Sequence, residues 1–191
     1  GTNRPLTFAR DGAGTLFYTT RLRYAADELF QQGLDRGFLV ERSYAPYVEN
    51  GTRPDATSYK AGDLVRVTLT LQLTKERRFV AVSDPLPAGF EPLESWFATT
   101  ARALAANESA TDGEEPSWEA RWQRGGFDHV ERHDDRVQLF ATRLAEGRHE
   151  FTYLARATTA GTFRTAPARA EEMYEPEVFG RTGTSVITVQ R

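Results

Sequence analysis

The chain of 191 residues carries 24 basic and 27 acidic side chains, and its net charge of −3 provides no field to attract nucleic acid or an anionic membrane. Its hydrophobic content of 39% and aromatic content of 12% exclude a disordered chain. No run of residues approaches the roughly 18 apolar residues that a membrane-spanning helix needs. The absence of cysteine excludes disulfides, thiolate metal sites and thiol nucleophiles.

The main pattern along the chain is an alternation of apolar and polar residues, which places one set of side chains on each face of a β-strand. It is clearest at Leu64–Leu73. The side chains that this pattern turns inward are Val65, Val67, Leu69, Leu71, Phe151 and Tyr153. We predict further strands, in chain order, at Leu16–Tyr24, Gly37–Tyr44, Arg78–Ser83, Phe127–His133, Arg136–Thr142, Phe151–Ala157, Thr162–Thr165 and Thr184–Gln190.

Helical composition is confined to Ala25–Gln32 and Glu94–Ala106. The polar, acidic stretch Asn107–Glu119 is predicted to be a loop. Many short strands and few helices predict an all-β fold, an antiparallel β-sandwich of immunoglobulin-like architecture with one or two short helical segments. We expect residues 1–14 to be a flexible N-terminal segment and residues 15–191 to form a single sandwich domain.

The residues do not predict a catalytic site. The sequence contains no nucleophile elbow, phosphate-binding loop, dinucleotide-binding glycine motif or metalloprotease helix motif, so we expect no enzyme activity and no cofactor. Paired acidic residues such as Glu171 and Glu172 are better explained by a solvated face than by glycoside hydrolysis.

Four residues that could bind Zn²⁺ or Mn²⁺ lie within seven positions of each other: His129, His133, Asp134 and Asp135. Residues four apart on a strand share a face but lie roughly 13 Å apart, too far to bind one ion without other ligands between them. We therefore expect no metal, and we interpret Asp134 and Asp135 as turn formers before the next strand.

Met173 and Tyr174 stand out because they include the only methionine and lie among charged residues, with Pro176 following. This setting favours a surface loop that displays two large side chains, as contact sites commonly do. Burial of both side chains beneath a loop is the alternative that the residues leave open.

Seven segments, in this order and spacing, resemble the C-terminal end of bacterial α2-macroglobulins over roughly residues 15 to 191. They are residues 36–44, 59–64, 82–91, 133–137, 151–157, 161–163 and 167–177, among them the turn Asp84-Pro-Leu-Pro-Ala-Gly-Phe90 and the run Met173-Tyr-Glu-Pro-Glu177. The resemblance implies a macroglobulin-like β-sandwich, the last domain of a large protease trap. It also implies a periplasmic, lipid-anchored parent protein.

In that family a proteinase cuts a bait region, and a thioester in a separate helical domain then captures the proteinase covalently. This chain has no cysteine and no thioester motif, so the covalent step does not reside in it. Some bacterial members lack the thioester, which leaves the parent's capture mode open. The implied partners are other domains of the same protein, including the thioester domain, and target proteinases; a penicillin-binding protein is a further candidate.

The resemblance also implies a site. Met173 and Tyr174 would form an interface loop that shields the thioester from water, and Glu172, Glu175 and Glu177 would form its polar rim. The competing hypothesis is a stand-alone β-sandwich for adhesion or carbohydrate binding. Further β domains and a thioester motif upstream in the gene would decide between the two.

Overall fold

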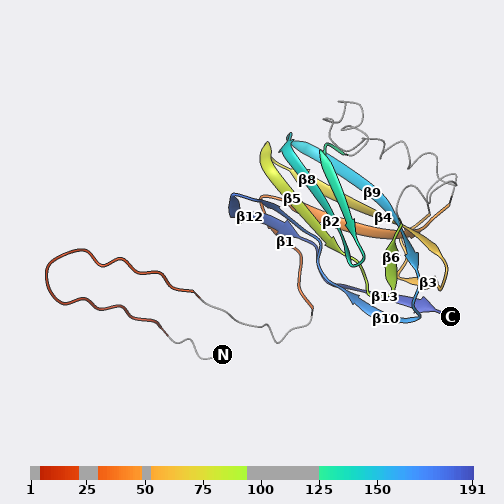
Figure 1. Ribbon diagram of the computed structural model, residues 1–191, viewed down its shortest axis with the longest axis horizontal. Helices are drawn as coiled ribbons and strands as arrows, with labels where there is room; N and C mark the ends of the chain where they lie inside the picture. The colour runs from red at the N-terminus through yellow and green to blue at the C-terminus, as the bar shows by residue number, and fades with distance from the viewer. Residues whose placement is uncertain (1–4, 22–29, 49–52, 94–124) are drawn as a thin grey trace.

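A computed structural model describes residues 5–21, 30–48, 53–93 and 125–191. Every regular element in these ranges is a β-strand (Figure 1). The strands are β1 (Leu34–Arg36), β2 (Leu39–Pro46), β3 (Ser58–Lys60), β4 (Leu64–Leu73), β5 (Arg77–Pro85), β6 (Phe90–Pro92), β7 (His129–His133), β8 (Arg136–Leu144), β9 (Gly147–Ala157), β10 (Gly161–Thr165), β11 (Arg169–Glu172), β12 (Glu175–Arg181) and β13 (Ser185–Gln190). Within the same ranges, no helix is long and apolar enough to cross a membrane.

The strands form three sheets. The largest has the order β1-β12-β11-β5-β8-β7, the second has the order β2-β4-β9-β6, and a small third sheet has the order β10-β13-β3. All strand pairs are antiparallel except β13 with β3, which is parallel. The predicted all-β sandwich is therefore confirmed, with one parallel pair added at its edge (Figure 1).

The core lies where the two large sheets face each other, and β4 shows how the sequence builds it. Val65, Val67, Leu69 and Leu71 are buried, as the alternation predicted, and the residues between them turn outward. On the neighbouring strand β9, Phe151 pairs with Leu69 and Tyr153 with Val67, and both of these side chains are buried too. The buried set continues across the other large sheet through Val80, Val82, Val137 and Leu139.

The chain crosses from the six-stranded sheet to the four-stranded sheet at Gly37. This residue has a φ of 113°, and its N–H donates to Asp35 Oδ1 over 2.8 Å. A Cβ at this position would clash with the Arg77 guanidinium, which donates to the Gly37 carbonyl over 3.1 Å. Glycine is required here both by the backbone conformation and by this close approach.

A buried ion pair joins the sheets in the interior. Arg42 on β2 contacts Asp84 on β5 at 2.5 Å, and the exposed fractions of the two side chains are 2% and 0%. The Tyr153 hydroxyl on β9 donates to the other Asp84 oxygen over 2.7 Å. The second Arg42 nitrogen donates to Thr165 Oγ1 and to the Ala166 carbonyl, over 3.1 and 2.9 Å, so the pair also holds the end of β10.

The charges of this pair follow from its surroundings. Burial lowers the pKa of Arg42, but Asp84, Tyr44 and Tyr153 together more than offset this effect, so the pKa of Arg42 is raised and its guanidinium stays charged. Burial raises the pKa of Asp84, against the opposing effects of Arg42 and the Tyr153 hydrogen bond. Burial also raises the pKa of Tyr153, which keeps its hydroxyl a neutral donor.

One predicted strand is wrong. Residues 15–21 form no strand, and Leu16, Phe17 and Tyr18 are exposed; residues 22–24 lie outside the described ranges. The alternation there has no neighbouring strand to pair with, and Tyr18 instead stacks on Phe8 with ring centres 4.3 Å apart. The division of the chain at residue 14 stays a prediction; the first strand of the sheets begins at Leu34.

The predicted helical stretch Glu94–Ala106 and the predicted loop Asn107–Glu119 lie outside the described residues. So does Ala25–Gln32 apart from residues 30–32, which form no helix.

The buried ion pair yields a stability prediction. Asp84→Asn should lower the free energy of unfolding by about 3–5 kcal/mol, because it leaves the Arg42 charge buried without a counter-charge. Tyr153→Phe removes one hydrogen bond to the same carboxylate and should cost less, about 1.5–3 kcal/mol. Urea unfolding followed by fluorescence measures both, with the exposed Asp135→Asn as the matched control that should leave unfolding unchanged. An Asp84→Asn variant as stable as that control would contradict the role assigned to the pair.

Candidate functional site

Met173 and Tyr174 form the turn of a β-hairpin made by β11 and β12. The hairpin register runs from Arg169 opposite Arg181 to Glu172 opposite Glu175, with a register shift between Glu171 and Glu172. The Met173 side chain is 51% exposed and that of Tyr174 is 77% exposed. The structure thus places both residues at the surface, as the two-residue turn of a hairpin.

Glu172 anchors this hairpin tip to β5. One of its carboxylate oxygens accepts the Arg78 N–H over 3.0 Å, and the other lies 3.5 Å from Arg77 Nη1. Its side chain is 14% exposed, so it turns inward, while Glu175 and Glu177 are exposed. Of the three residues predicted to form a polar rim, only Glu175 and Glu177 are exposed. The role of this rim in docking stays a prediction.

Arg77 extends the anchor into the fold. Its buried guanidinium lies over the Phe38 ring, 5.4 Å from the ring centre, and it also bonds the Gly37 carbonyl. The hairpin tip is thereby tied through two side chains, Glu172 and Arg77, to the segment where the chain changes sheets. These ties make the tip a fixed part of the sandwich.

Phe79 is the residue of this site that the sequence reasoning missed. It lies on β5 next to the tip, its side chain is 47% exposed, and its carbonyl accepts the Met173 N–H over 2.9 Å. Its ring meets the Tyr174 ring edge to face, with ring centres 5.2 Å apart and planes at 85°. Phe79, Met173 and Tyr174 together form one exposed apolar surface, which we call the hairpin tip surface.

The tip surface lies far from the C-terminus. Glu172 pairs with Val80 near the start of β5, whereas the C-terminus follows β13 at the other end of the molecule, as Figure 1 shows. The β4–β5 and β8–β9 turns also lie near the start of β5, because Arg77 pairs with Leu144 and Leu73 with Gly147.

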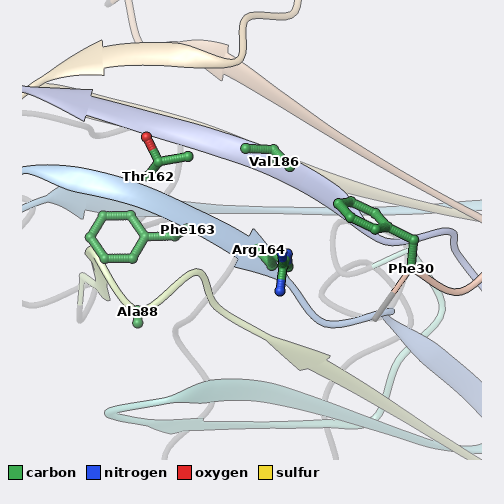
Figure 2. Close-up of a pocket in the computed structure, with 6 residues that line it drawn as sticks. All are labelled: Phe30, Ala88, Thr162, Phe163, Arg164 and Val186. Atoms are coloured by element: carbon green, nitrogen blue, oxygen red, sulfur yellow. The ribbon is translucent and has the colours of Figure 1, made fainter. Parts of the chain in front are cut away.

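A second surface feature is a shallow hollow of 530 Å³ beside β10 and β13. Figure 2 shows its lining, which consists of Phe30, Ala88, Thr162, Phe163, Arg164 and Val186. A Cβ at Gly89 would clash with the Phe163 ring, so this glycine of the Asp84–Phe90 turn makes room for the ring. The hollow presents one charged side chain, Arg164, whose guanidinium lies over the Phe30 ring. The contacts of Gly89 with Phe163 and of Arg164 with Phe30 are packing contacts, so we assign no binding function to this hollow.

The histidines predicted not to bind a metal lie on the edge strand β7. Glu131 lies between them, with one carboxylate oxygen 3.3 Å from His129 Nε2 and the other 3.3 Å from His133 Nε2. In the part of the chain that the structure describes, no group of three acidic, histidine or cysteine residues has the geometry to hold a metal ion. Asp134 and Asp135 form the turn between β7 and β8, with Asp135 paired to Arg136.

Comparison with known proteins identifies the family. Residues 37–177 match the family model described as "Bacterial Alpha-2-macroglobulin MG10 domain". The chain belongs to this family. The matched range contains the strands from β2 to β11 and the first three residues of β12, so the tip surface lies within it.

Two of the relatives described next are α2-macroglobulins by name, in agreement with the family match. The α2-macroglobulin homologue of Nostoc is 28% identical over 97% of this chain, and the α2-macroglobulin of Escherichia coli is 30% identical over 67% of it. The circularly permutated Ras protein 2 of Dictyostelium discoideum is 28% identical over 94% of this chain. The chain spans 4% of the Dictyostelium protein, 9% of the Nostoc protein and 8% of the Escherichia coli protein, so it corresponds to a small part of each.

Solved structures show the same fold. The native conformation of Escherichia coli α2-macroglobulin matches with a TM-score of 0.64 and 23% identity, over 84% of this chain and 10% of that one. Salmonella α2-macroglobulin reacted with methylamine matches with a TM-score of 0.63 and 25% identity, over 84% and 10%. The MG10 fold of this chain is therefore that of a macroglobulin-like domain.

The metal expectation is open to direct measurement. The MG10 chain purified without chelators should carry no stoichiometric zinc or manganese by elemental analysis, and His129→Ala should not change its metal content. A stoichiometric metal that is lost on His129→Ala or His133→Ala would contradict this expectation.

The contact between Glu172 and Arg77 leads to a prediction about stability. Glu172→Gln should lower the free energy of unfolding by about 1–3 kcal/mol, because the nearly buried Arg77 loses its charged partner. Glu175→Gln, on the exposed side of the same turn, is the matched control and should leave thermal unfolding unchanged. Equal effects of the two substitutions would show that Glu172 does not anchor the hairpin.

Proposed function

We propose that this chain is a non-catalytic domain of a bacterial α2-macroglobulin-like peptidase inhibitor, in which it packs against the thioester-bearing domain and shields the thioester. The observation that carries the proposal is that Met173 and Tyr174 are exposed at the tip of a hairpin anchored to the sandwich. The family match favours this function over a stand-alone adhesion or carbohydrate-binding module.

The chemistry of a thioester supports a lid of this kind. A thioester survives in water only if its carbonyl is kept from solvent, and apolar or aromatic bulk from an apposed surface provides that barrier. Methionine suits the role because its unbranched thioether conforms to an irregular neighbour. Tyrosine adds a large rigid area and one hydrogen-bonding group at its end.

The setting of the tip supports docking as well. Two apolar side chains exposed on a rigid turn lose little conformational entropy when another surface covers them. The charges of Glu175 and Glu177 would set the orientation of docking more than its affinity. In this proposal the parent is a periplasmic, lipid-anchored protein that acts on proteinases, with a penicillin-binding protein as a further candidate partner.

The test uses the full-length parent before any proteinase is added. Met173→Ala together with Tyr174→Ala should speed its reaction with methylamine, measured by the release of free thiol, because water and small amines would reach the thioester. Val186→Ala removes an exposed apolar side chain away from the tip and is the matched control, expected to react like the unchanged protein.

Circular dichroism of the variants checks that the fold is kept. An unchanged methylamine rate in a folded double variant would overturn the shielding role. An unmodified parent that releases no thiol with methylamine would overturn it too, because there would be no thioester to shield.

A further inference from the structure

We infer that Phe79 is a positioning residue of the hairpin tip surface: it holds Tyr174 in the orientation needed for docking, and the fold accepts backbone strain to place it there. The inference rests on the proposed function, because the docking partner it names is the thioester-bearing domain. It adds a residue outside the Met173–Tyr174 turn, and its test separates the two ideas.

The backbone of Phe79 is the first observation. Among the described residues, it is the one residue other than glycine with a positive φ, at 50°. The left-handed region is unfavourable for a bulky side chain, and strain of this kind persists where surrounding structure enforces it, often at functional sites.

The strand pairing shows where this conformation comes from. On β5 the inward residues are Arg77 and then Val80, so Arg78 and Phe79 both turn outward and the alternation is lost for one step. The partner strand β8 breaks its alternation at the same level, where Thr142 and Arg143 both turn outward. The register of β5 with β8 runs from Arg78 opposite Arg143 directly to Val80 opposite Ala141, so the ladder between these strands is interrupted at Phe79. On the other side of β8, the Thr142 N–H donates to Asp128 Oδ2 over 2.6 Å.

An irregularity of this kind explains a left-handed residue at position 79, but it does not explain phenylalanine. Glycine adopts the same φ without steric cost. The Phe79 ring is about half exposed, so burial returns only part of what the strain costs. A further role of the ring is needed to account for the residue.

The contacts of Phe79 supply that role. Its carbonyl fixes the Met173 backbone through the 2.9 Å hydrogen bond, and its ring forms the edge-to-face contact with Tyr174. Tyr174 is the most exposed member of the tip, and without this contact its ring would sample several rotamers. Phe79 therefore holds both tip residues from one side and leaves their other sides free for a partner.

The partner is assigned to the same polypeptide. The chain corresponds to 9–10% of the Nostoc homologue and of the Salmonella structure, so most of such a protein lies outside the chain described here. A pre-oriented aromatic surface suits a neighbour that is held close by covalent linkage, because the contact then needs little further ordering. In this inference the neighbour is the thioester-bearing domain.

Phe79→Gly separates positioning from structure. It relieves the strained φ and removes the ring, so the thermal unfolding temperature of the chain should stay the same or rise. In the full-length parent it should speed the methylamine reaction about two- to tenfold, the range expected for loss of one aromatic pair. Phe79→Tyr keeps the ring and should restore the slow reaction.

A double variant tests whether Phe79 acts through Tyr174. Phe79→Gly added to Tyr174→Ala should speed the reaction no further than Tyr174→Ala alone, because the ring contact is already lost. Additive effects would mean that Phe79 does not act through Tyr174 and would overturn the positioning role. Phe79→Asn, which tolerates the left-handed conformation, serves as a second ring-less variant.

The outcomes distinguish this inference from the proposed function. If the Met173 and Tyr174 substitutions speed the reaction but Phe79→Gly and Phe79→Asn do not, shielding stands and the inference is overturned. If Phe79→Gly and Phe79→Asn both destabilise the chain, Phe79 has a structural role and the inference is overturned as well. If the Met173 and Tyr174 substitutions have no effect, the proposed function fails first.

Discussion

The buried ion pair between Arg42 and Asp84 is the constraint on which the arrangement of the three sheets depends. Two charges removed from water must be paired and hydrogen-bonded, and few arrangements satisfy all of their donors and acceptors. Here β2 provides the guanidinium, β5 the carboxylate and the Pro85 carbonyl, β9 the Tyr153 hydroxyl, and the end of β10 two further acceptors. Thr165 passes the network on to Ser185 on β13, with 2.6 Å between the two hydroxyl oxygens. A shift of β2 or β5 would separate the two buried charges, and a shift of β9 or β10 would remove hydrogen bonds that the pair needs.

The same two segments are joined a second time at the far end of β5. Arg77 begins this strand and bonds Gly37, just before β2, while Asp84 near its end bonds Arg42 within β2. With both ends held, β5 has little freedom to slide. Because β11 pairs with β5, the hairpin is held in place by the same strand. The buried charges that fix β5 therefore also fix the position of the exposed tip.

The strongly patterned part of the fold could be predicted from the sequence, because β4, β13 and β8 as far as Ala141 alternate between core and surface. The second half of β9 likewise has a buried residue at every second position from Phe151. Strands β1, β3 and β6 have three residues each, too few to show a period, and β11 and β12 are rich in charged residues. The ion pair carried no signal either, since Arg42 and Asp84 are far apart in sequence and Asp84 precedes a proline, as turn residues often do. Charged neighbours around Met173 and Tyr174 did indicate the surface, but the anchoring Glu172 looked the same in sequence as the exposed Glu175.

Phe79 shows most clearly what sequence patterns leave out. Within the apolar run that follows Arg78, phenylalanine resembles any other strand residue, and nothing in its type predicts a left-handed backbone. The strain arises only in the folded chain, where β5 and β8 lose their alternation at the same level and the Phe79 carbonyl accepts the Met173 N–H. Local preference is contradicted at one exposed residue, and sites of this kind are where proteins sacrifice stability for function. The conflict between residue type and backbone at position 79 is therefore a better pointer to the working surface of this domain than its exposure alone.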